Sequence, residues 1–346
     1  MNKKVRIGII GIGSFSRMHM KGVTEAYNAE LVGLAEPDET RLHQHDEKFR
    51  VTDVPHYTDY NELLARDDVD AIIVATNDQA HREVTVAALK AGKPVLCEKP
   101  MALNTADCKA MIDASKESGA MLMIGQVARF NPAAQKIIEI VKSGKLGEIF
   151  YVESEYAHDY SKIPGSTGWR RDPDRHGIIG GGCHAVDLLR CIAGNPEEVF
   201  AYSSNKVLTD WPVYDCTVAS IKFPNGVLGK MFCSIGAKRP QVDRTVVYGT
   251  KGTLYKDTFG TYLYMDKVSD EPMFADLNQQ QIRVHIPNAS KGHNTTAEVE
   301  EFCAAILEGR ESSCPGVEGA ITAYTCMAMV ESSKTGKPVK LNYDFL

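Results

Sequence analysis

A short apolar segment that runs into a glycine-rich turn restricts the fold of this chain more than any other feature of its sequence. Residues 5–10 are mostly apolar, the turn Gly11-Ile12-Gly13 follows, and a segment with helical character begins at Ser16. Glycines at such a junction let the backbone turn tightly from a parallel strand into a helix and approach a phosphate closely. The turn matches G-x-G-x-x-G with serine in the last position, and it predicts a dinucleotide-binding βαβ unit; a tight turn without a ligand is the alternative. The expected cofactor contacts in the turn are Gly11, Gly13, Ser14, Phe15 and Ser16.

The first 125 residues repeat this alternation of strand and helix. Apolar runs, expected to be buried strands, are separated by segments with helical signals such as Asn104, a predicted N-cap. The run at 69–75 is nearly continuous, as expected for a strand buried on both faces of a parallel sheet. The expected strands are 5–10, 30–35, 69–75, 95–97 and 121–125. Residues 1–125 are therefore predicted to form an α/β Rossmann domain with a doubly wound parallel sheet.

The pattern changes in residues 126–346. A long strand is expected at 148–156, a loop-like region at 159–181, and a hairpin around Pro224-Asn225-Gly226. Two helices are expected to close the chain, at about 295–307 and 317–333. These features predict a second, α+β domain over 126–346, with a large, mostly antiparallel open sheet for substrate binding and oligomerisation, and with a last helix that can pack back on the first domain. Because the exposed face of such a sheet needs a cover, a homodimer or homotetramer is expected.

Composition limits the class of partner. The chain has 346 residues, 24% of them charged, and a formal net charge of −6 without a basic stripe, which argues against nucleic-acid binding. Its nine cysteines include no C-x-x-C pair, which indicates reduced thiols rather than a disulfide framework. No run approaches the ~20 apolar residues that span a bilayer, and the apolar start is too short for a signal peptide. A cytoplasmic protein that does not bind membranes is expected.

Glu36 ends the second expected strand, 23 residues after Gly13. A carboxylate at this position accepts hydrogen bonds from the adenosine ribose hydroxyls of NAD and repels the 2′-phosphate of NADP. Pro37 follows, where an arginine would have favoured NADP. The sequence thus predicts NAD as the cofactor, with NADP disfavoured; a solvated strand end is the alternative for Glu36.

Lys99 follows a short apolar strand and precedes Pro100, which restricts it to extended conformations. Its side chain can then point from the carboxyl end of the sheet toward the crevice in which open α/β folds bind ligands. An ammonium group there could polarise a carbonyl or exchange a proton with a substrate hydroxyl. A surface lysine is the alternative.

A second glycine cluster, Gly180-Gly181-Gly182, precedes a segment that begins Cys183-His184 and is predicted to be a helix. The glycines could let the backbone approach a ligand. His184 and Asp187 are three residues apart and share a helix face, so the acid could orient the imidazole as a base. A helix-capping histidine is equally compatible. No metal site is expected here, because no H-x-x-x-H or paired-cysteine motif accompanies the histidine.

The loop 168–176 places an aromatic ring beside several guanidinium groups, beginning with Trp169 and Arg170. This combination suits a sugar ring or parts of the cofactor, although a charged surface loop is the alternative. His158, at the end of the long strand, is a weaker candidate for the site.

Taken together, these segments resemble the Gfo/Idh/MocA family, which includes glucose–fructose oxidoreductase, inositol dehydrogenase and related sugar dehydrogenases. The resemblance covers nearly the whole chain. It rests on Gly11-x-Gly13, Ala75-Thr76-Asn77 with His81, Ala91–Pro100 with its Glu98-Lys99-Pro100 run, Arg129-Phe130-Asn131-Pro132, Gly144-Lys145-Leu146-Gly147 and Gly181–Asp187. It implies that Lys99 and His184 flank the reacting carbinol, opposite the nicotinamide. It also implies cofactor contacts from Thr76, Asn77, His81, Glu98, Lys99, Trp169 and Arg170.

One position departs from the family pattern. Many members carry D-x-G-x-H, whereas this chain has Gly180 four residues before His184. The usual lysine–aspartate–histidine triad is therefore incomplete. The expected substrate contacts are Lys99, Arg129, Tyr156, His158, His176, Gly180, His184 and Asp187.

The main hypothesis is an NAD-dependent oxidoreductase that transfers a hydride between nicotinamide and a secondary alcohol or ketone of a sugar, cyclitol or related polyol. Lys99 and His184 are its expected catalytic residues. A glycosidase or epimerase that uses NAD for transient oxidation is the second hypothesis. A non-catalytic sensor of sugar or NAD is the third.

Overall fold

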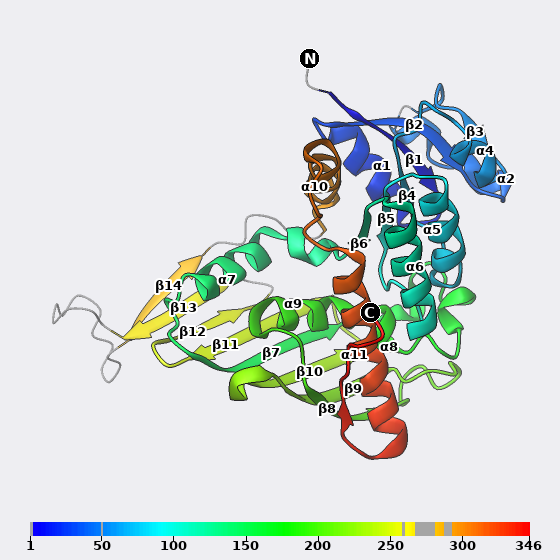
Figure 1. The fold of residues 1–346 in the computed structure, drawn as a ribbon. Coiled ribbons are helices and arrows are strands. Elements are labelled where there is room, and N and C mark those ends of the chain that lie inside the picture. Colours follow the sequence, from blue (N-terminus) through cyan, green and yellow to red (C-terminus); the bar gives the residue numbers. More distant parts are fainter. Residues whose placement is uncertain (1–2, 50, 258–259, 267–280, 287–292) are drawn as a thin grey trace. The chain divides into compact units, whose positions relative to one another are not determined.

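The computed structural model describes residues 3–49, 51–257, 260–266, 281–286 and 293–346, and the chain forms two compact units (Figure 1). Unit 1 consists of Met1–Phe130, His293–Tyr324 and Tyr343–Leu346, and unit 2 of Asn131–Gly292 and Thr325–Asn342. The units therefore differ from the expected single boundary after residue 125, because the chain returns to unit 1 near its end. In the part of the chain that is described, no helix is long and apolar enough to cross a membrane.

Unit 1 contains a six-stranded parallel sheet in the order β3-β2-β1-β4-β5-β6. Its strands are β1 (Val5–Ile10), β2 (Ala29–Ala35), β3 (His56–Tyr57), β4 (Ala71–Val74), β5 (Val95–Glu98) and β6 (Leu122–Gly125). Its helices are α1 (Ser16–Glu25), α2 (Glu39–Leu42), α3 (Asp46–Phe49), α4 (Tyr60–Leu64), α5 (His81–Lys90), α6 (Thr105–Ser118) and α10 (Thr295–Glu308), with 3-10 turns η1 (Asp78–Ala80) and η2 (Val127–Phe130). The predicted doubly wound sheet is confirmed. Asn104 caps α6 as expected, since its side chain accepts from the Asp107 N–H.

Helix α10 completes the core of unit 1 although almost 300 residues separate it from β1. Val299, Phe302 and Cys303 are fully buried and pack in one cluster with Met20 and Val23 of α1. Asn28 also donates from its side chain to the carbonyl of Glu300. These contacts between distant segments explain why a boundary read from local pattern alone places residues 293–324 in the second domain.

Unit 2 is built on a nine-stranded sheet in the order β14-β13-β12-β11-β7-β10-β9-β8-β15. Its strands are β7 (Ile149–Ala157), β8 (Glu198–Ser204), β9 (Cys216–Lys222), β10 (Leu228–Ser234), β11 (Val242–Gly249), β12 (Gly252–Lys256), β13 (Thr261–Asp266), β14 (Gln281–Ile286) and β15 (Val339–Lys340). The β7–β10 pair is parallel and the other pairs are antiparallel, so the predicted mostly antiparallel sheet is confirmed. The predicted hairpin joins β9 and β10 through 3-10 turn η5 (Pro224–Gly226), where Asn225 and Gly226 have positive φ.

The helices of this part of the chain are α7 (Pro132–Lys142), α8 (Gly177–Gly180) and α9 (Cys183–Ala193), with 3-10 turns η3 (Tyr160–Lys162) and η4 (Trp169–Arg171). Helix α11 (Gly316–Thr335) contributes its first part to unit 1 and its last part to unit 2. The expected loop at 159–181 thus contains two 3-10 turns and a helical turn. The helical turn was not predicted, because α8 begins with Gly177 and ends with Gly180, and glycines are more typical of loops.

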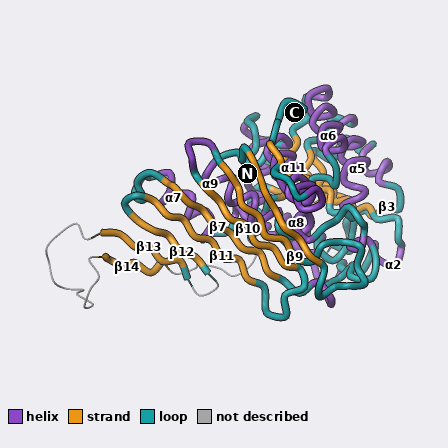
Figure 2. The backbone as a smooth tube through the Cα atoms, turned by 90° about the horizontal axis from the view of Figure 1, so that it is seen from below, coloured by secondary structure: helices purple, strands orange, loops and turns teal. Residues whose placement is uncertain are grey.

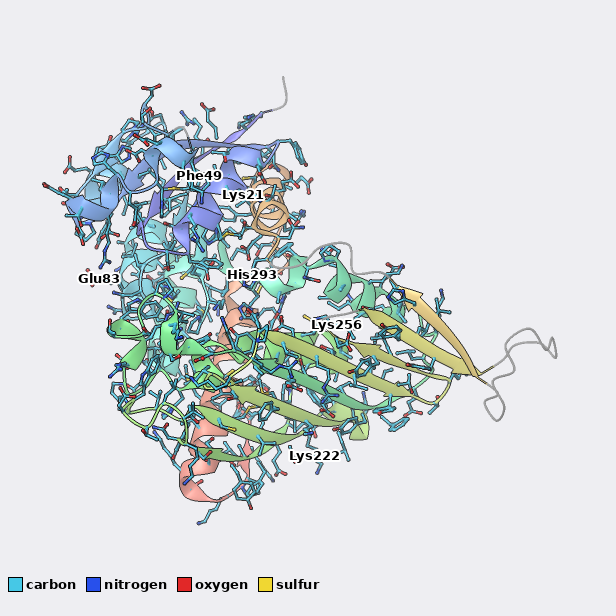
Figure 3. All side chains as sticks on the ribbon, turned by 180° about the vertical axis from the view of Figure 1, so that it is seen from behind. Lys21, Phe49, Glu83, Lys222, Lys256 and His293 are labelled. Atoms are coloured by element: carbon cyan, nitrogen blue, oxygen red, sulfur yellow. The ribbon has the colours of Figure 1, made fainter. Side chains whose placement is uncertain are left out.

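One face of the large sheet carries exposed apolar side chains. Figure 2 shows the strands in front of α7 and α9, so this sheet is covered by these helices on one side. Along β9, buried and exposed residues alternate strictly. Exposed apolar side chains occur on β7, β8, β9, β10 and β11: Phe150, Tyr202, Val218, Leu228 and Tyr248. Polar residues such as Lys222, labelled in Figure 3, alternate with the buried ones.

Candidate active site

Gly11 is required by the close approach of two strand ends in unit 1. Its φ is +93°, a conformation that L side chains rarely adopt, and its N–H donates to the carbonyl of Ala35 at 2.8 Å. A Cβ at this position would lie 2.6 Å from the backbone nitrogen of Thr76. The first glycine of the turn therefore serves contact between the ends of β1 and β4.

Gly13 differs from Gly11, because apart from Gly13 and its two chain neighbours no described residue has an atom within 4 Å of the place that its Cβ would take. Next to it, the buried Ser16 hydroxyl donates to the Gly13 carbonyl at 2.6 Å and fits the position of the third glycine. Helix α1 has no acidic residue in its first turn and no side-chain cap at Phe15 among the described residues. The turn therefore offers open space and backbone N–H groups to an anion, which fits the pyrophosphate of NAD.

Two further turn residues differ in burial. Ser14 is exposed. Phe15 is partly buried, with edge-on ring contacts to His19 at 5.6 Å and to His293, labelled in Figure 3, at 5.7 Å. Phe15 therefore fixes the start of α1 by packing.

Glu36 is tied to the glycine turn. Its carboxylate accepts from the Ile12 N–H at 2.9 Å and from the Asp38 N–H at 3.2 Å, and the residue is only 8% exposed. The alternative of a solvated strand end is therefore wrong. Each carboxylate oxygen can accept more than one hydrogen bond, so capacity remains for a ribose hydroxyl.

Thr76, Asn77 and His81 follow β4. Asn77 caps η1, since its side chain accepts from the Ala80 N–H at 3.1 Å, and the Thr76 hydroxyl donates to the Asn77 carbonyl at 3.1 Å. His81 is buried, with its Nδ1 at 2.9 Å from the carbonyl of Pro100. His81 thus connects the start of α5 to the segment that carries Lys99.

Lys99 follows directly on a buried pair of ionisable side chains. Glu98 Oε1 lies 2.7 Å from Nε2 of His19, and Glu98 Oε2 accepts from the Lys99 backbone N–H at 3.0 Å. Burial would raise the pKa of the Glu98 carboxyl, but the hydrogen bond from His19 and the charges of His19 and Lys99 outweigh it, so this pKa is lowered. Glu98 therefore remains an anion beside Lys99. The Lys99–Pro100 peptide bond is cis.

Glu298 of α10 is a second buried carboxyl beside this pair. It is 0% exposed, its carboxyl lies within 4.8 Å of both His19 and Glu98, and neither of its oxygens has a hydrogen-bond partner among the described residues. Burial, and then the charge of Glu98, raise its pKa well above the usual range. Glu298 is thus held as a neutral acid. No local motif indicated Glu298. His19 could have been noticed in the sequence, because it lies one turn into α1, three residues after Ser16 of the glycine turn.

Arg129 lies in η2 and holds the segment that precedes α11. Its guanidinium donates to the Ser313 carbonyl at 2.7 Å and lies 3.3 Å from a carboxylate oxygen of Glu318. Its side chain is 12% exposed. Within unit 1 it connects two segments far apart in sequence.

In unit 2, His184 lies in the first turn of α9 and is 7% exposed. Its ring is 6.0 Å from the ring of Tyr156, whose hydroxyl lies 3.0 Å from that of Tyr160 and 3.5 Å from Nδ1 of His158. Burial, and then Tyr160, raise the pKa of Tyr156 well above its usual value, while burial lowers the pKa of His158. A histidine and a neutral phenol donor are thus brought together on β7 and α9.

Asp187 and His176 have partners of their own in unit 2. The carboxylate of Asp187 lies 3.8 Å from the guanidinium of Arg190, and both side chains are almost fully buried. Nδ1 of His176 accepts from the Tyr214 N–H at 2.9 Å. Burial, and then the charge of Lys334, lower the pKa of His176 to about 4, so this histidine is neutral and packs against Tyr214 at neutral pH.

The three consecutive glycines make room for protein side chains. A Cβ at Gly180 would lie against the guanidinium of Arg175, one at Gly181 would lie 2.6 Å from the Tyr156 ring, and one at Gly182 would lie 2.7 Å from Ile178. These glycines were expected to let the backbone approach a ligand. The space next to each of them, where a Cβ would lie, is instead filled by side chains of the protein. Arg175, only 1% exposed, fills the position next to Gly180.

Trp169 and Arg170 form a stacked arrangement with Arg175. The guanidinium carbon of Arg170 lies 4.2 Å from the centre of the Trp169 ring and 5.6 Å from that of Tyr160, and that of Arg175 lies 4.8 Å from the Trp169 ring. The loop thus places two cations on one aromatic ring, and one of them also lies over Tyr160, whose hydroxyl is 3.0 Å from that of Tyr156.

The comparisons with known proteins agree with both units. Residues 5–126 match the family model for the oxidoreductase family with an NAD-binding Rossmann fold (GFO_IDH_MocA), and residues 134–255 match the GFO/IDH/MocA C-terminal domain. The chain is 31% identical over 340 residues to 4-carboxy-2-hydroxymuconate-6-semialdehyde dehydrogenase of a Sphingobium species, covering 94% of this chain and 98% of the relative. It is 28% identical over 328 residues to myo-inositol 2-dehydrogenase of Thermotoga maritima, covering 88% and 94%.

A solved structure is similar over the same length. The aldose-aldose oxidoreductase from Caulobacter crescentus, complexed with glycerol, matches with a TM-score of 0.83 and 25% identity, covering 98% of this chain and all of that one. The protein is an oxidoreductase with an NAD-binding Rossmann domain, and it belongs to the Gfo/Idh/MocA family.

Proposed function

We propose that the protein oxidises a secondary alcohol of a sugar, cyclitol or related polyol with NAD, or reduces the corresponding ketone. The observation that carries the proposal is the combination, within unit 1, of a glycine turn with open space at Gly13 and a lysine that directly follows the buried His19–Glu98 pair. Two of the similar proteins, myo-inositol 2-dehydrogenase and aldose-aldose oxidoreductase, support this class of substrate.

NAD, when bound, supplies the hydride acceptor at C4 of its nicotinamide. In the oxidation direction, we assign to His184 the removal of the hydroxyl proton as the hydride leaves the carbinol carbon. Lys99 would then hold the substrate oxygen and stabilise its developing negative charge. The reverse assignment of the two roles uses the same residues. Thr76, Asn77, His81, Glu98, Trp169 and Arg170 remain the proposed further cofactor contacts.

The structure supports some of the proposed substrate contacts more than others. Tyr156 lies beside His184, and His158 lies beside Tyr156; together they can present a phenol hydroxyl and a neutral imidazole to substrate hydroxyls. Arg129, His176, Gly180 and Asp187 already have structural contacts in their own units. Substitution of Tyr156 or His158 is therefore expected chiefly to raise KM, whereas substitution of any of the other four is expected to lower stability as well.

The proposal includes NAD rather than NADP, because the Glu36 carboxylate would repel a 2′-phosphate. It also includes a homodimer or homotetramer, because the apolar side chains on the open face of the large sheet need a cover. A cytoplasmic location is supported by the nine cysteines, all of which are described and none of which forms a disulfide bond.

The test is a panel of sugars and cyclitols with NAD or NADP, followed at the absorbance band of the reduced nicotinamide. Lys99→Ala and His184→Asn should each lower kcat/KM by about 10²–10⁴-fold, while Lys90→Ala, an exposed lysine at the end of α5, should not change it. Full activity of Lys99→Ala would overturn the assignment. Substrate turnover without net change in added NAD would instead indicate the glycosidase or epimerase hypothesis.

A further inference from the structure

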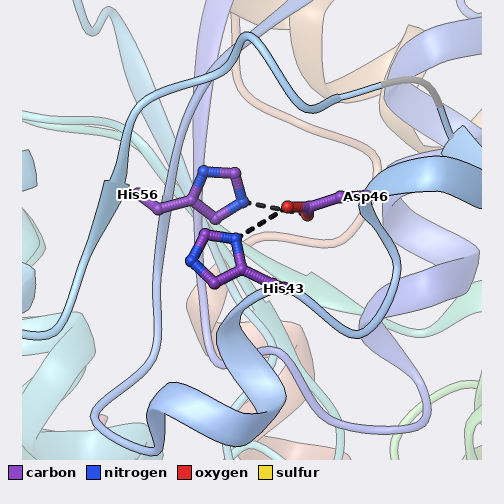
Figure 4. Close-up of side chains that lie close together, drawn as sticks. All are labelled: His43, Asp46 and His56. Atoms are coloured by element: carbon purple, nitrogen blue, oxygen red, sulfur yellow. Dashed lines mark hydrogen bonds and ion pairs between the residues drawn. The ribbon is translucent and has the colours of Figure 1, made fainter.

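Two histidines and an aspartate meet outside the candidate active site, at one end of the sheet of unit 1. His43 follows α2, Asp46 begins α3, and His56 lies in the edge strand β3. Figure 4 shows both imidazoles directed at the same carboxylate: Nδ1 of His43 lies 2.7 Å from one oxygen of Asp46, and Nε2 of His56 lies 3.0 Å from the other. We propose that these three side chains bind a divalent transition-metal ion, with zinc as the expected occupant.

The geometry brings the donors together without a large rearrangement. All three ligand atoms lie within 4.8 Å of one another, and the two rings are 4.4 Å apart between their centres. Donors about 2.0–2.2 Å from a zinc ion lie roughly 3.0–3.6 Å from each other. A small outward shift of His43, whose side chain is 62% exposed, would open the required space.

The donor set selects the class of ion. Imidazole nitrogens favour zinc, copper, nickel and iron over calcium and magnesium, whose preferred ligands are oxygens. Asp46 and His56 are 11% and 9% exposed in their side chains, so two ligands are held by packing. The more exposed His43 provides an entry path, and water can complete the coordination on its side. No sequence motif indicated this site, because the spacing of positions 43, 46 and 56 matches no known metal-binding pattern.

The backbone on both sides of the site is also fixed. His56 pairs with Leu34 in the sheet, and the Asp46 carbonyl accepts from the Val51 N–H at 3.0 Å. Between the ligands, the Gln44 side chain donates to the carbonyl of Ile12 in the glycine turn. Because the Ile12 N–H donates to Glu36, an ion at this site would brace the loop that holds the turn. Zinc and NAD are therefore expected to strengthen each other's binding.

The first experiment titrates the full-length protein, stripped of metal by chelation, with Zn²⁺ by calorimetry and with Co²⁺ by its visible d–d absorption. The wild type should bind one ion at this site, and His43→Ala and His56→Gln should each weaken binding about 10–100-fold or more. His45→Gln is the matched control, because His45 lies in the same loop but is in ring contact with Phe49. His43 is exposed, so its variant remains informative if His56→Gln does not fold.

Failure of the wild type to bind zinc would overturn the proposal and leave the cluster as a hydrogen-bonded link between α3 and β3. Equal affinity in the wild type and in His43→Ala would also overturn it, since the ion would then be bound elsewhere, for instance by a cysteine. The second experiment compares zinc affinity with and without NAD. Equal values would overturn the coupling to the glycine turn. Neither experiment depends on the substrate, so both are separate from the test of the proposed activity.

Discussion

In unit 1 most candidate site residues lie at the carboxyl ends of parallel strands. In unit 2 they lie on 3-10 turns, on helices and at the end of β7. Lys99 of unit 1 follows β5 and the buried His19–Glu98 pair. His184 of unit 2 lies in the first turn of α9, with its ring 6.0 Å from that of Tyr156. The first arrangement is maintained by buried charge and sheet geometry, and the second by side-chain packing.

The glycines of the two units illustrate this difference. Gly11 serves a backbone contact, and Gly13 leaves space that no described protein atom fills. Gly180, Gly181 and Gly182 each make room for a side chain of the protein itself. Glycine-rich sequence therefore signals a ligand only where the structure leaves the space open. The predictions below separate these cases.

The largest effect is expected at Gly11. Gly11→Ala combines a left-handed conformation with a backbone overlap, and should lower the free energy of unfolding by about 2–5 kcal/mol. Gly92→Ala is the matched control: Gly92 has φ +73° but no described atom within 4 Å of its added Cβ, so about 1–2 kcal/mol is expected. Urea denaturation of both variants measures the difference. Equal losses would show that the strand contact contributes nothing.

Gly180→Ala tests the packing in unit 2. The new methyl group would displace the buried guanidinium of Arg175 from its position next to Trp169, at a cost of about 1–3 kcal/mol. In the double variant Gly180→Ala, Arg175→Met, the obstructing atoms are gone and the alanine should cost much less. A double-mutant cycle of unfolding free energies measures this coupling. Additive costs would contradict the packing argument.

The pH dependence of stability tests the buried charge in unit 1. Since the folded pKa of Glu298 is raised, the folded state keeps a proton that the unfolded state releases above pH ~4.3. Stability from this group is fully present at lower pH and is lost as pH rises toward the folded pKa. The wild type should therefore lose stability relative to Glu298→Gln at up to about 1.4 kcal/mol per pH unit above that point.

Denaturant unfolding of both proteins from pH 4 to 8 measures this slope. Glu98, whose lowered pKa has the opposite sign, is present in both proteins and does not produce the difference by itself. A constant difference across the range would show that Glu298 is ionised in the folded protein.

Gly13→Ala should have the smallest effect on stability, within about 0.5 kcal/mol, because its methyl group meets no described protein atom. It should nevertheless weaken NAD binding about 10–100-fold, since the methyl group occupies the space proposed for the pyrophosphate. Calorimetric titration with NAD measures the change. Unchanged affinity would contradict the placement of the cofactor on this turn.

The parts that the sequence predicted correctly are those with local signals. Five of the six parallel strands of unit 1 appear as apolar runs, whereas the short β3 was not predicted. Asn104 precedes its helix at the capping position, and Pro224-Asn225-Gly226 marks a hairpin. Each signal lies within a few residues of the structure that it specifies. The same holds for the turn at Gly11 and for β5, which was expected at 95–97 and extends one residue further, to Glu98.

The parts that were not predicted depend on contacts between distant residues. Glu298 meets Glu98 across 200 positions, and nothing in its own helix distinguishes it from a surface acid. The return of α10 to unit 1 has the same cause. At Gly180 the glycine itself was noticed, but the reason for it, the guanidinium of Arg175, depends on how the preceding loop folds back. Helix α8 was not predicted either, because the glycines at both of its ends are more typical of a loop than of a helix.

The return of α10 also has a consequence for synthesis of the protein. A ribosome that has made residues 1–130 has produced every strand of the parallel sheet, but Met20 and Val23 still lack the partners Val299 and Phe302. Unit 2 is likewise incomplete until residues 325–342 have been synthesised. Both units are therefore completed only after residues 293–346 have emerged, and nascent chains that stop earlier expose an apolar flank of α1 to chaperones and proteases.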